Sequence, residues 1–173
     1  MSLNKIEDML SDVFVKKAPK MPENGKKALV QYLPWIDLVL GILTLWSALV
    51  LWHWAHLANA FVNYANSINQ LYGNNLVQAN RLTAGVWFGL IVLIVEGVLY
   101  LAAFPGLRER KKSGWNLLFY ASMVNVVYAI VIFFTDYGGI GTLLGSLIGT
   151  AIGLYILFQV RSAYKGHNTA QSE

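Results

Sequence analysis

Cysteine is absent from this chain of 173 residues, and charged residues are scarce. The lack of cysteine excludes disulfide bonds, thiolate metal sites and a cysteine nucleophile. Asp, Glu, Lys and Arg make up only 13% of the residues, whereas soluble domains contain about a quarter. The sequence also contains no Ser-His-Asp elbow, HExxH motif, phosphate loop or dinucleotide fingerprint. These absences argue against a soluble domain and favour a protein that is not an enzyme.

Long apolar runs are what the sequence has in abundance, since 56% of the residues are hydrophobic and the mean hydropathy is +0.49. Four runs cover approximately residues 33–57, 84–104, 114–134 and 138–160. Each is long enough for an α-helix to cross a hydrocarbon core of about 30 Å. The sequence therefore predicts an all-α integral membrane protein with four transmembrane helices. The first run starts too late and is too long for a signal peptide.

Basic residues lie almost entirely on one side of the predicted spans. Six lysines precede the first span, and the connection between spans two and three contains "RERKK". Arg161 and Lys165 follow the last span, whereas the two remaining connections contain only Arg81. Because loops rich in Lys and Arg stay in the cytoplasm, this distribution predicts that both termini are cytoplasmic. The expected location is the plasma membrane or a bacterial inner membrane.

The segment before the first span is predicted to form a helix and a linker. Apolar residues in 1–15 recur at helical spacing, which indicates an amphipathic cytoplasmic helix. Its polar face mixes acids with Lys5, so docking onto a protein surface, its own or a partner's, competes with lipid binding. Residues 16–32 are expected to be a basic, solvated linker, and residues 163–173 a cytoplasmic tail.

The connection between the first two spans predicts a helical extension of the first span outside the membrane. Apolar residues such as Phe61, Tyr64 and Ile68 share one face, and asparagines occupy the other. The helix should end near Gly73. We expect this extension to lie along the membrane surface or over the bundle, with a docking platform for a partner as the alternative.

Four glycines recur at every fourth position in the last span: Gly141, Gly145, Gly149 and Gly153. Small residues let membrane helices approach closely, which makes this stripe a predicted packing face, or glycine zipper. The third span carries Ala121, Asn125 and Ala129 at the same spacing. The favoured interpretation is that spans three and four pack through these faces, and the alternative is self-association through the stripe.

Two histidines, His53 and His56, are spaced so that both rings can share one helical face. Such a pair can ligate a metal or haem. However, no acidic residue lies nearby in the sequence, and histidine and tryptophan are common at membrane interfaces. A metal site at these residues is therefore a weak candidate, and no cofactor is predicted.

Asp37 lies about four residues inside the first span. At that depth its carboxylate can reach the interface or pair with a basic residue at the same level. The candidate partners are Arg108, Lys111 and Arg161. A structural role is the expectation for this residue.

Glu96 lies deeper, about 12 Å from the inner end of its span at helical rise. An ionisable residue at that depth is costly and is a functional candidate. Counting inward from the cytoplasmic ends places Thr44, Asn125 and Thr150 at a comparable level. The sequence therefore predicts a polar intramembrane layer to which all four spans contribute.

Three functions remain open at this point. The leading hypothesis is a non-enzymatic accessory, assembly or scaffolding subunit that acts through helix–helix packing. The alternative is a small oligomeric channel or a proton- or cation-coupled transporter that uses Glu96. A redox or metal-binding subunit that uses His53 and His56 is the weakest. The expected partners are the lipid bilayer and either a second copy or another membrane protein, and no nucleic acid.

Overall fold

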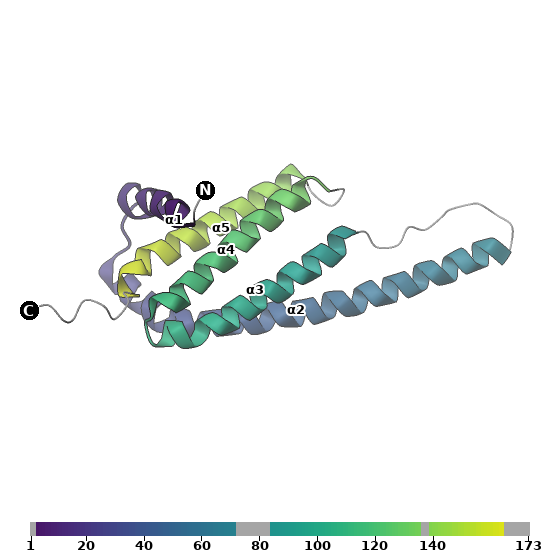
Figure 1. The fold of residues 1–173 in the computed structure, drawn as a ribbon, viewed down its shortest axis with the longest axis horizontal. Helices are drawn as coiled ribbons and strands as arrows, with labels where there is room; N and C mark the ends of the chain where they lie inside the picture. Colours follow the sequence, from purple (N-terminus) through teal and green to yellow (C-terminus); the bar gives the residue numbers. More distant parts are fainter. Residues whose placement is uncertain (1–2, 72–83, 136–138, 165–173) are drawn as a thin grey trace, which may run out of the picture.

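The computed structural model describes residues 3–71, 84–135 and 139–164, and these form a bundle of long helices (Figure 1). The elements are α1 (Leu3–Ser11), a π-helical segment η1 (Asp12–Lys17), α2 (Glu23–Leu71), α3 (Ala84–Arg108), α4 (Lys112–Phe133), α5 (Ile140–Val160) and a 3-10 turn η2 (Arg161–Ala163). Four helices, α2 to α5, are long and apolar enough to cross a membrane. The prediction of an all-helical chain with four such helices is therefore confirmed.

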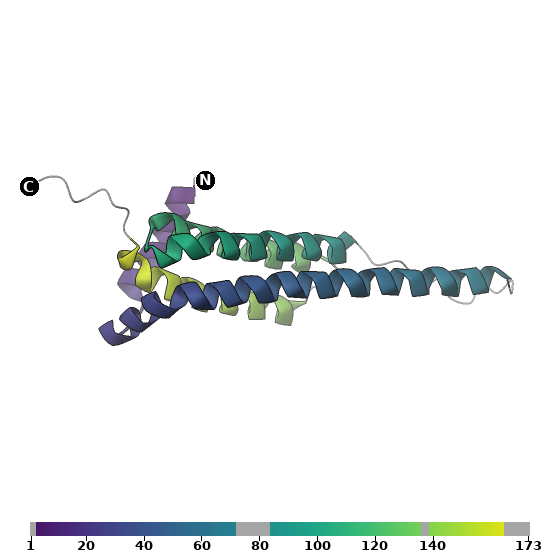
Figure 2. The ribbon, with the colours of Figure 1, turned by 90° about the horizontal axis from the view of Figure 1, so that it is seen from below.

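Helix α2 begins earlier than predicted, and its outer part is helical as predicted. It begins at Glu23, so the segment expected to be a linker is non-helical only at residues 18–22. Glu23 pairs with Lys26 in the first turn, which stabilises the start of this helix. With 49 residues, α2 spans about 74 Å at helical rise. It continues to Leu71 without a break and projects beyond the other helices (Figures 1 and 2).

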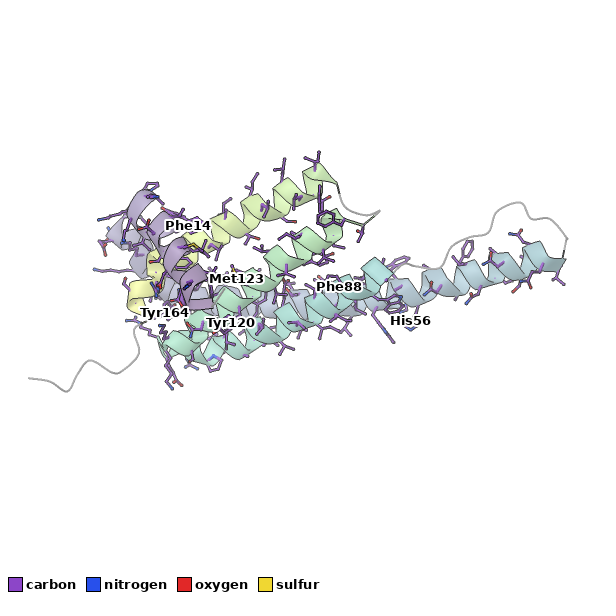
Figure 3. The ribbon with its side chains drawn as sticks, turned by 45° about the horizontal axis from the view of Figure 1, so that its top comes forward. Phe14, His56, Phe88, Tyr120, Met123 and Tyr164 are labelled. Atoms are coloured by element: carbon purple, nitrogen blue, oxygen red, sulfur yellow. The ribbon has the colours of Figure 1, made fainter. Side chains whose placement is uncertain are left out.

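Consecutive helices pack side by side, whereas α2 and α5 make only a small contact. The α4–α5 and α2–α3 pairs converge at the end where α5 stops and α3 turns into α4, and they diverge towards the other end (Figure 1). We name the convergent end the terminal end. The main core lies there, built around Leu107, Trp115, Phe119 and Phe158. Phe14 and Tyr164 lie at this end and His56 lies far from it (Figure 3).

Close packing over glycine occurs between α2 and α3. A Cβ placed on Gly97 would lie 2.6 Å from the Leu45 side chain and 3.4 Å from the Gly41 carbonyl oxygen. Gly41 is equally crowded, since its Cβ would lie 2.9 Å from the Leu101 side chain. Two buried glycines therefore allow the two helices to approach closely, as small residues do in membrane helix pairs.

The turn between α3 and α4 ends α3 with a Schellman motif. The Lys111 N–H donates to the Gly106 carbonyl at 2.8 Å, and the Arg110 N–H donates to the Leu107 carbonyl at 3.1 Å. Arg110 has φ 55°, in the left-handed region where glycine is the usual residue. The turn thus satisfies the last carbonyls of α3 and positions four basic residues at the terminal end.

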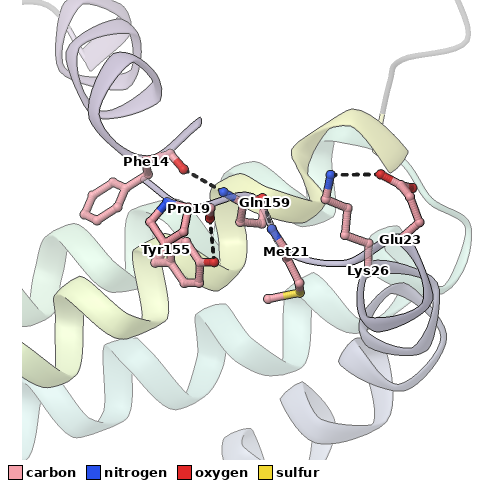
Figure 4. A network of polar contacts seen from close by, with 7 residues as sticks. All are labelled: Phe14, Pro19, Met21, Glu23, Lys26, Tyr155 and Gln159. Atoms are coloured by element: carbon pink, nitrogen blue, oxygen red, sulfur yellow. Dashed lines mark hydrogen bonds and ion pairs between the residues drawn. The ribbon is translucent and has the colours of Figure 1, made fainter. Parts of the chain in front are cut away.

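The N-terminal segment docks onto the chain's own bundle. Apolar residues of α1 and η1, including Ile6, Leu10 and Phe14, pack against the core at the terminal end. Gln159 fixes the segment twice, because its Nε2 donates to the Phe14 carbonyl at 2.8 Å and its Oε1 accepts from the Met21 N–H at 3.2 Å (Figure 4). Arg161 also forms an ion pair with Glu7. The amphipathic face therefore covers the end of α5.

Candidate functional sites in the bundle

Glu96, Asn125 and Thr150 lie together between three helices. Glu96 of α3 is buried, and its Oε1 accepts a hydrogen bond from Asn125 Nδ2 of α4 at 3.0 Å. Thr150 Oγ1 of α5 donates to Asn125 Oδ1 at 3.5 Å. We call these three residues the polar ladder. The polar ladder joins α3, α4 and α5 at one level, in agreement with the depths predicted for these three residues.

Thr44, the fourth residue of the predicted layer, is half-buried on α2. Among the described residues, the polar ladder receives no hydrogen bond from it. Depth alone placed Thr44 at this level, and a common depth does not ensure a hydrogen bond. In the ladder the Asn125 amide donates to the Glu96 carboxyl group, and this hydrogen bond is of a kind that stabilises packing between helices.

Asp37 adopts neither arrangement that the sequence left open for it, since it does not reach the interface and does not pair with a described basic residue. Its side chain is buried on α2, with the residue only 2% exposed. Neither carboxyl oxygen has a hydrogen-bond partner among the described residues. Arg161, one of the expected partners, pairs with Glu7 instead. Sequence spacing gives the depth of Asp37 but not which side chains surround it.

Asp37 lines a cavity of about 240 Å³ to which α2, α3, α4 and α5 all contribute. Tyr100 of α3 and Ser122 of α4 are the other polar side chains in its wall. The remaining lining is apolar apart from Gly153, and includes Leu40 and Ile156. We name this space the Asp37 cavity. The only sign of this cavity in the sequence is an acidic residue, Asp37, inside an apolar run.

The four glycines of α5, which we call the glycine face, do not pack against span three. A Cβ added at Gly141, Gly145, Gly149 or Gly153 would meet nothing within 4 Å in the described chain. The predicted pairing of spans three and four through this stripe is therefore wrong. Helix α5 does pack on α4, and Ala121 and Ala129 are buried on α4. However, α5 presents a different side to its neighbour.

The histidine pair lies on α2, where both side chains are exposed. His56 Nδ1 lies 3.0 Å from the Trp52 carbonyl oxygen, within hydrogen-bond distance. Its ring packs against Trp52 at 4.4 Å and against Trp87 of α3 at 5.7 Å, measured between ring centroids. No cluster of three His, Cys, Asp or Glu side chains occurs in the part of the chain that the structure describes. These contacts explain His56 as a packing residue between α2 and α3.

A basic pocket of about 830 Å³ lies at the terminal end, beside the docked N-terminal segment. Lys20, Lys26, Lys112 and Arg161 contribute to its wall. Tyr164 also lines it, and burial raises the pKa of this hydroxyl to about 12. Clusters of basic side chains next to membrane spans attract anionic headgroups. Basic residues that the sequence predicted to share one side of the membrane thus lie together at the terminal end of the bundle.

The fold and these sites define a class, a four-helix bundle with apolar helices of membrane-spanning length. Comparisons with protein-family models, curated proteins and solved structures give no match to this chain.

Glu96→Gln is expected to change the free energy of unfolding by less than about 1 kcal/mol, because glutamine keeps the oxygen that accepts from Asn125. Glu96→Leu, which leaves the Asn125 amide unpaired, should be more destabilising. The measurement is unfolding in mixed micelles, together with proton and monovalent-cation flux in reconstituted vesicles. We expect no flux from either the parent or the Gln variant. A parental flux that the stable Gln variant loses would instead favour the transporter.

Proposed function

We propose that this chain is a non-enzymatic integral membrane subunit that associates with another transmembrane helix through the glycine face of α5. The observation that carries this proposal is the open space around all four glycines. Glycine weakens a helix relative to alanine unless a close backbone approach uses the missing side chain. Because no described part of the chain makes that approach, the partner is a second copy or another membrane protein.

The outer part of α2 supports the same proposal. Residues 58–71, which we call the stalk, extend past the start of α3, since Trp87 already contacts His56 (Figure 1). Its apolar side chains Phe61, Tyr64 and Leu71 are 66–84% exposed. A single amphipathic helix that projects from a bundle gains stability by covering such a face. The stalk therefore extends the association surface beyond the membrane.

The proposed orientation places the terminal end in the cytoplasm. It rests on the basic side chains at that end, which include those of the α3–α4 turn and Lys20 of the N-terminal segment. The stalk then projects on the opposite side of a plasma membrane or a bacterial inner membrane. A reporter fused after Ala163 that is found outside the cytoplasm would contradict this orientation.

Gly149→Leu tests the proposed association. We expect it to weaken association at least about tenfold, because a large side chain would hold the partner helix away. Thermal stability should stay unchanged, since the added Cβ meets nothing in the described chain. The chain contains no cysteine, so Ser146→Cys in the parent allows a specific disulfide cross-link between copies. Co-purification in mild detergent covers the case of a different partner.

Leu144→Ile serves as the matched control, because it alters α5 without changing the glycine face. It should leave cross-linking and co-purification at the parental level. If Gly149→Leu leaves the cross-linking yield and the set of co-purified proteins unchanged, the glycine face simply contacts lipid. That result would refute the proposal.

A further inference from the structure

Asp37 is a buried carboxyl group without a hydrogen-bond partner among the described residues, in a position that neither the fold nor the proposed association explains. It is only 2% exposed, and both oxygens lack hydrogen bonds within the described chain. Buried carboxylates are normally paired or hydrogen-bonded, because desolvation strongly penalises an isolated charge. Glu96 follows this rule by accepting from Asn125, whereas Asp37 does not. The contrast between two acids in one bundle points to a ligand that Asp37 is placed to meet.

The Asp37 cavity limits what this ligand can be. Its volume of about 240 Å³ is below the usual range for drug-sized ligands, which starts at about 300 Å³. Its wall is mostly apolar, with Leu33, Leu40 and Ile156 among the lining side chains. A peptide or a nucleotide is therefore too large and too polar. A small ligand with an apolar surface fits both the volume and the lining.

The polar groups of the wall determine the charge of the ligand. Asp37 supplies a single carboxylate, and Tyr100 supplies an aromatic ring. A hard metal ion needs several oxygen ligands, and the described chain has no cluster of three potential ligands. An organic ammonium ion needs only one counter-charge, and it also interacts favourably with an aromatic face. The combination of a carboxylate, a tyrosine ring and apolar walls is thus complementary to an ammonium group.

We propose that the Asp37 cavity is a binding site for a small organic ammonium ion, with Asp37 as the counter-ion and Tyr100 as the aromatic wall. The ammonium charge lies in the cavity beside Asp37, whose carboxyl oxygens are covered, and interacts with this carboxylate through the low dielectric of the bundle. The alkyl groups of the ligand contact the apolar side chains. Every lining residue belongs to one chain, so the proposal does not require a partner on the glycine face, although Gly153 of that face also lines the wall.

Choline is a suitable probe, and its neutral isostere 3,3-dimethylbutan-1-ol is the matched ligand control. Binding is measured by isothermal titration calorimetry on the full chain in dodecyl maltoside, a detergent without an ammonium group. We expect saturable choline binding and at least about tenfold weaker binding of the neutral isostere. This comparison uses the unaltered protein and does not depend on how any variant folds.

Asp37→Asn keeps the shape of the side chain and removes its charge. We expect it to weaken choline binding at least about thirtyfold, since one partner of a buried charge pair is lost. Tyr100→Leu should weaken binding less, and Glu96→Gln should retain it, because Glu96 does not line the cavity. Absence of saturable binding to the parent, equal binding of the neutral isostere, or unchanged affinity of Asp37→Asn would each overturn the proposal.

Discussion

Gly114→Ala is expected to destabilise the bundle by roughly 3 kcal/mol or more. A Cβ at this position would lie 2.4 Å from the Leu107 backbone nitrogen and 2.5 Å from the Gly106 carbonyl carbon. Both contacts are with backbone, so no side chain can rotate away to relieve them. Gly106 faces Gly114 in the same crowded contact, with its own Cβ position 2.7 Å from the Gly114 nitrogen. The α3–α4 turn would have to open, and the core beside it would loosen.

Gly145→Ala is the matched control for this prediction. It also adds one methyl group to a helical glycine, but nothing lies within 4 Å of the added atom. The change should be neutral or stabilising by at most about 1 kcal/mol, because alanine is the better helix former. Both variants are compared by denaturant titration in mixed micelles. Equal stability of the two variants would show that the α3 and α4 backbones are not in contact at the turn.

Trp115→Ala is expected to cost about 3–5 kcal/mol, as truncation of a large core aromatic usually does. Trp115 is fully buried at the terminal end. Its ring stacks on Phe119 at 5.6 Å and meets Phe158 edge-on at 5.3 Å, measured between centroids. Its Nε1 donates to the Leu157 carbonyl at 2.8 Å, which links α4 to α5. The truncation therefore removes apolar contact area and an interhelical hydrogen bond together.

A second variant at Trp115 separates the contribution of packing to the free energy of unfolding from that of the hydrogen bond. Trp115→Phe keeps one aromatic ring but removes the N–H donor and part of the ring area, so the lost hydrogen bond should cost about 1 kcal/mol in addition to the cost of the smaller ring. Trp46→Ala is the control, because Trp46 is 65% exposed on α2 and should shift stability by only about 0.5 kcal/mol. Near-parental unfolding of Trp115→Ala would show that the core does not centre on this residue.

The levels of residues along the helix axes could be predicted because the rise per residue of a helix is fixed. Counting from the basic ends brought Glu96, Asn125 and Thr150 to one depth, and the structure joins them by hydrogen bonds. The same counting included Thr44, which makes no hydrogen bond to them within the described chain. Depth along an axis follows from the sequence, whereas rotation about the axis depends on packing against the neighbouring helices.

Close packing over glycine also depends on more than the sequence pattern. The most regular glycine pattern, Gly141 to Gly153, meets nothing in the described chain, whereas Gly41 and Gly97 form a tight contact. Periodicity identifies which residues share a face of one helix. It contains no information about which other helix lies opposite, because many arrangements of four helices bury a similar apolar area.

The sequence by itself determined the four apolar helices and, except at the start of α2, their ends to within a few residues, because helix length must match the thickness of a bilayer. It also determined that the basic residues gather on one side. Tertiary structure alone decided that the N-terminal helix covers α5 and that, within the part of the chain that the structure describes, the glycine face stays open and Asp37 is buried without a partner. These properties depend on the angles and rotations at which helices pack, which are set by side-chain fit between segments far apart in the chain.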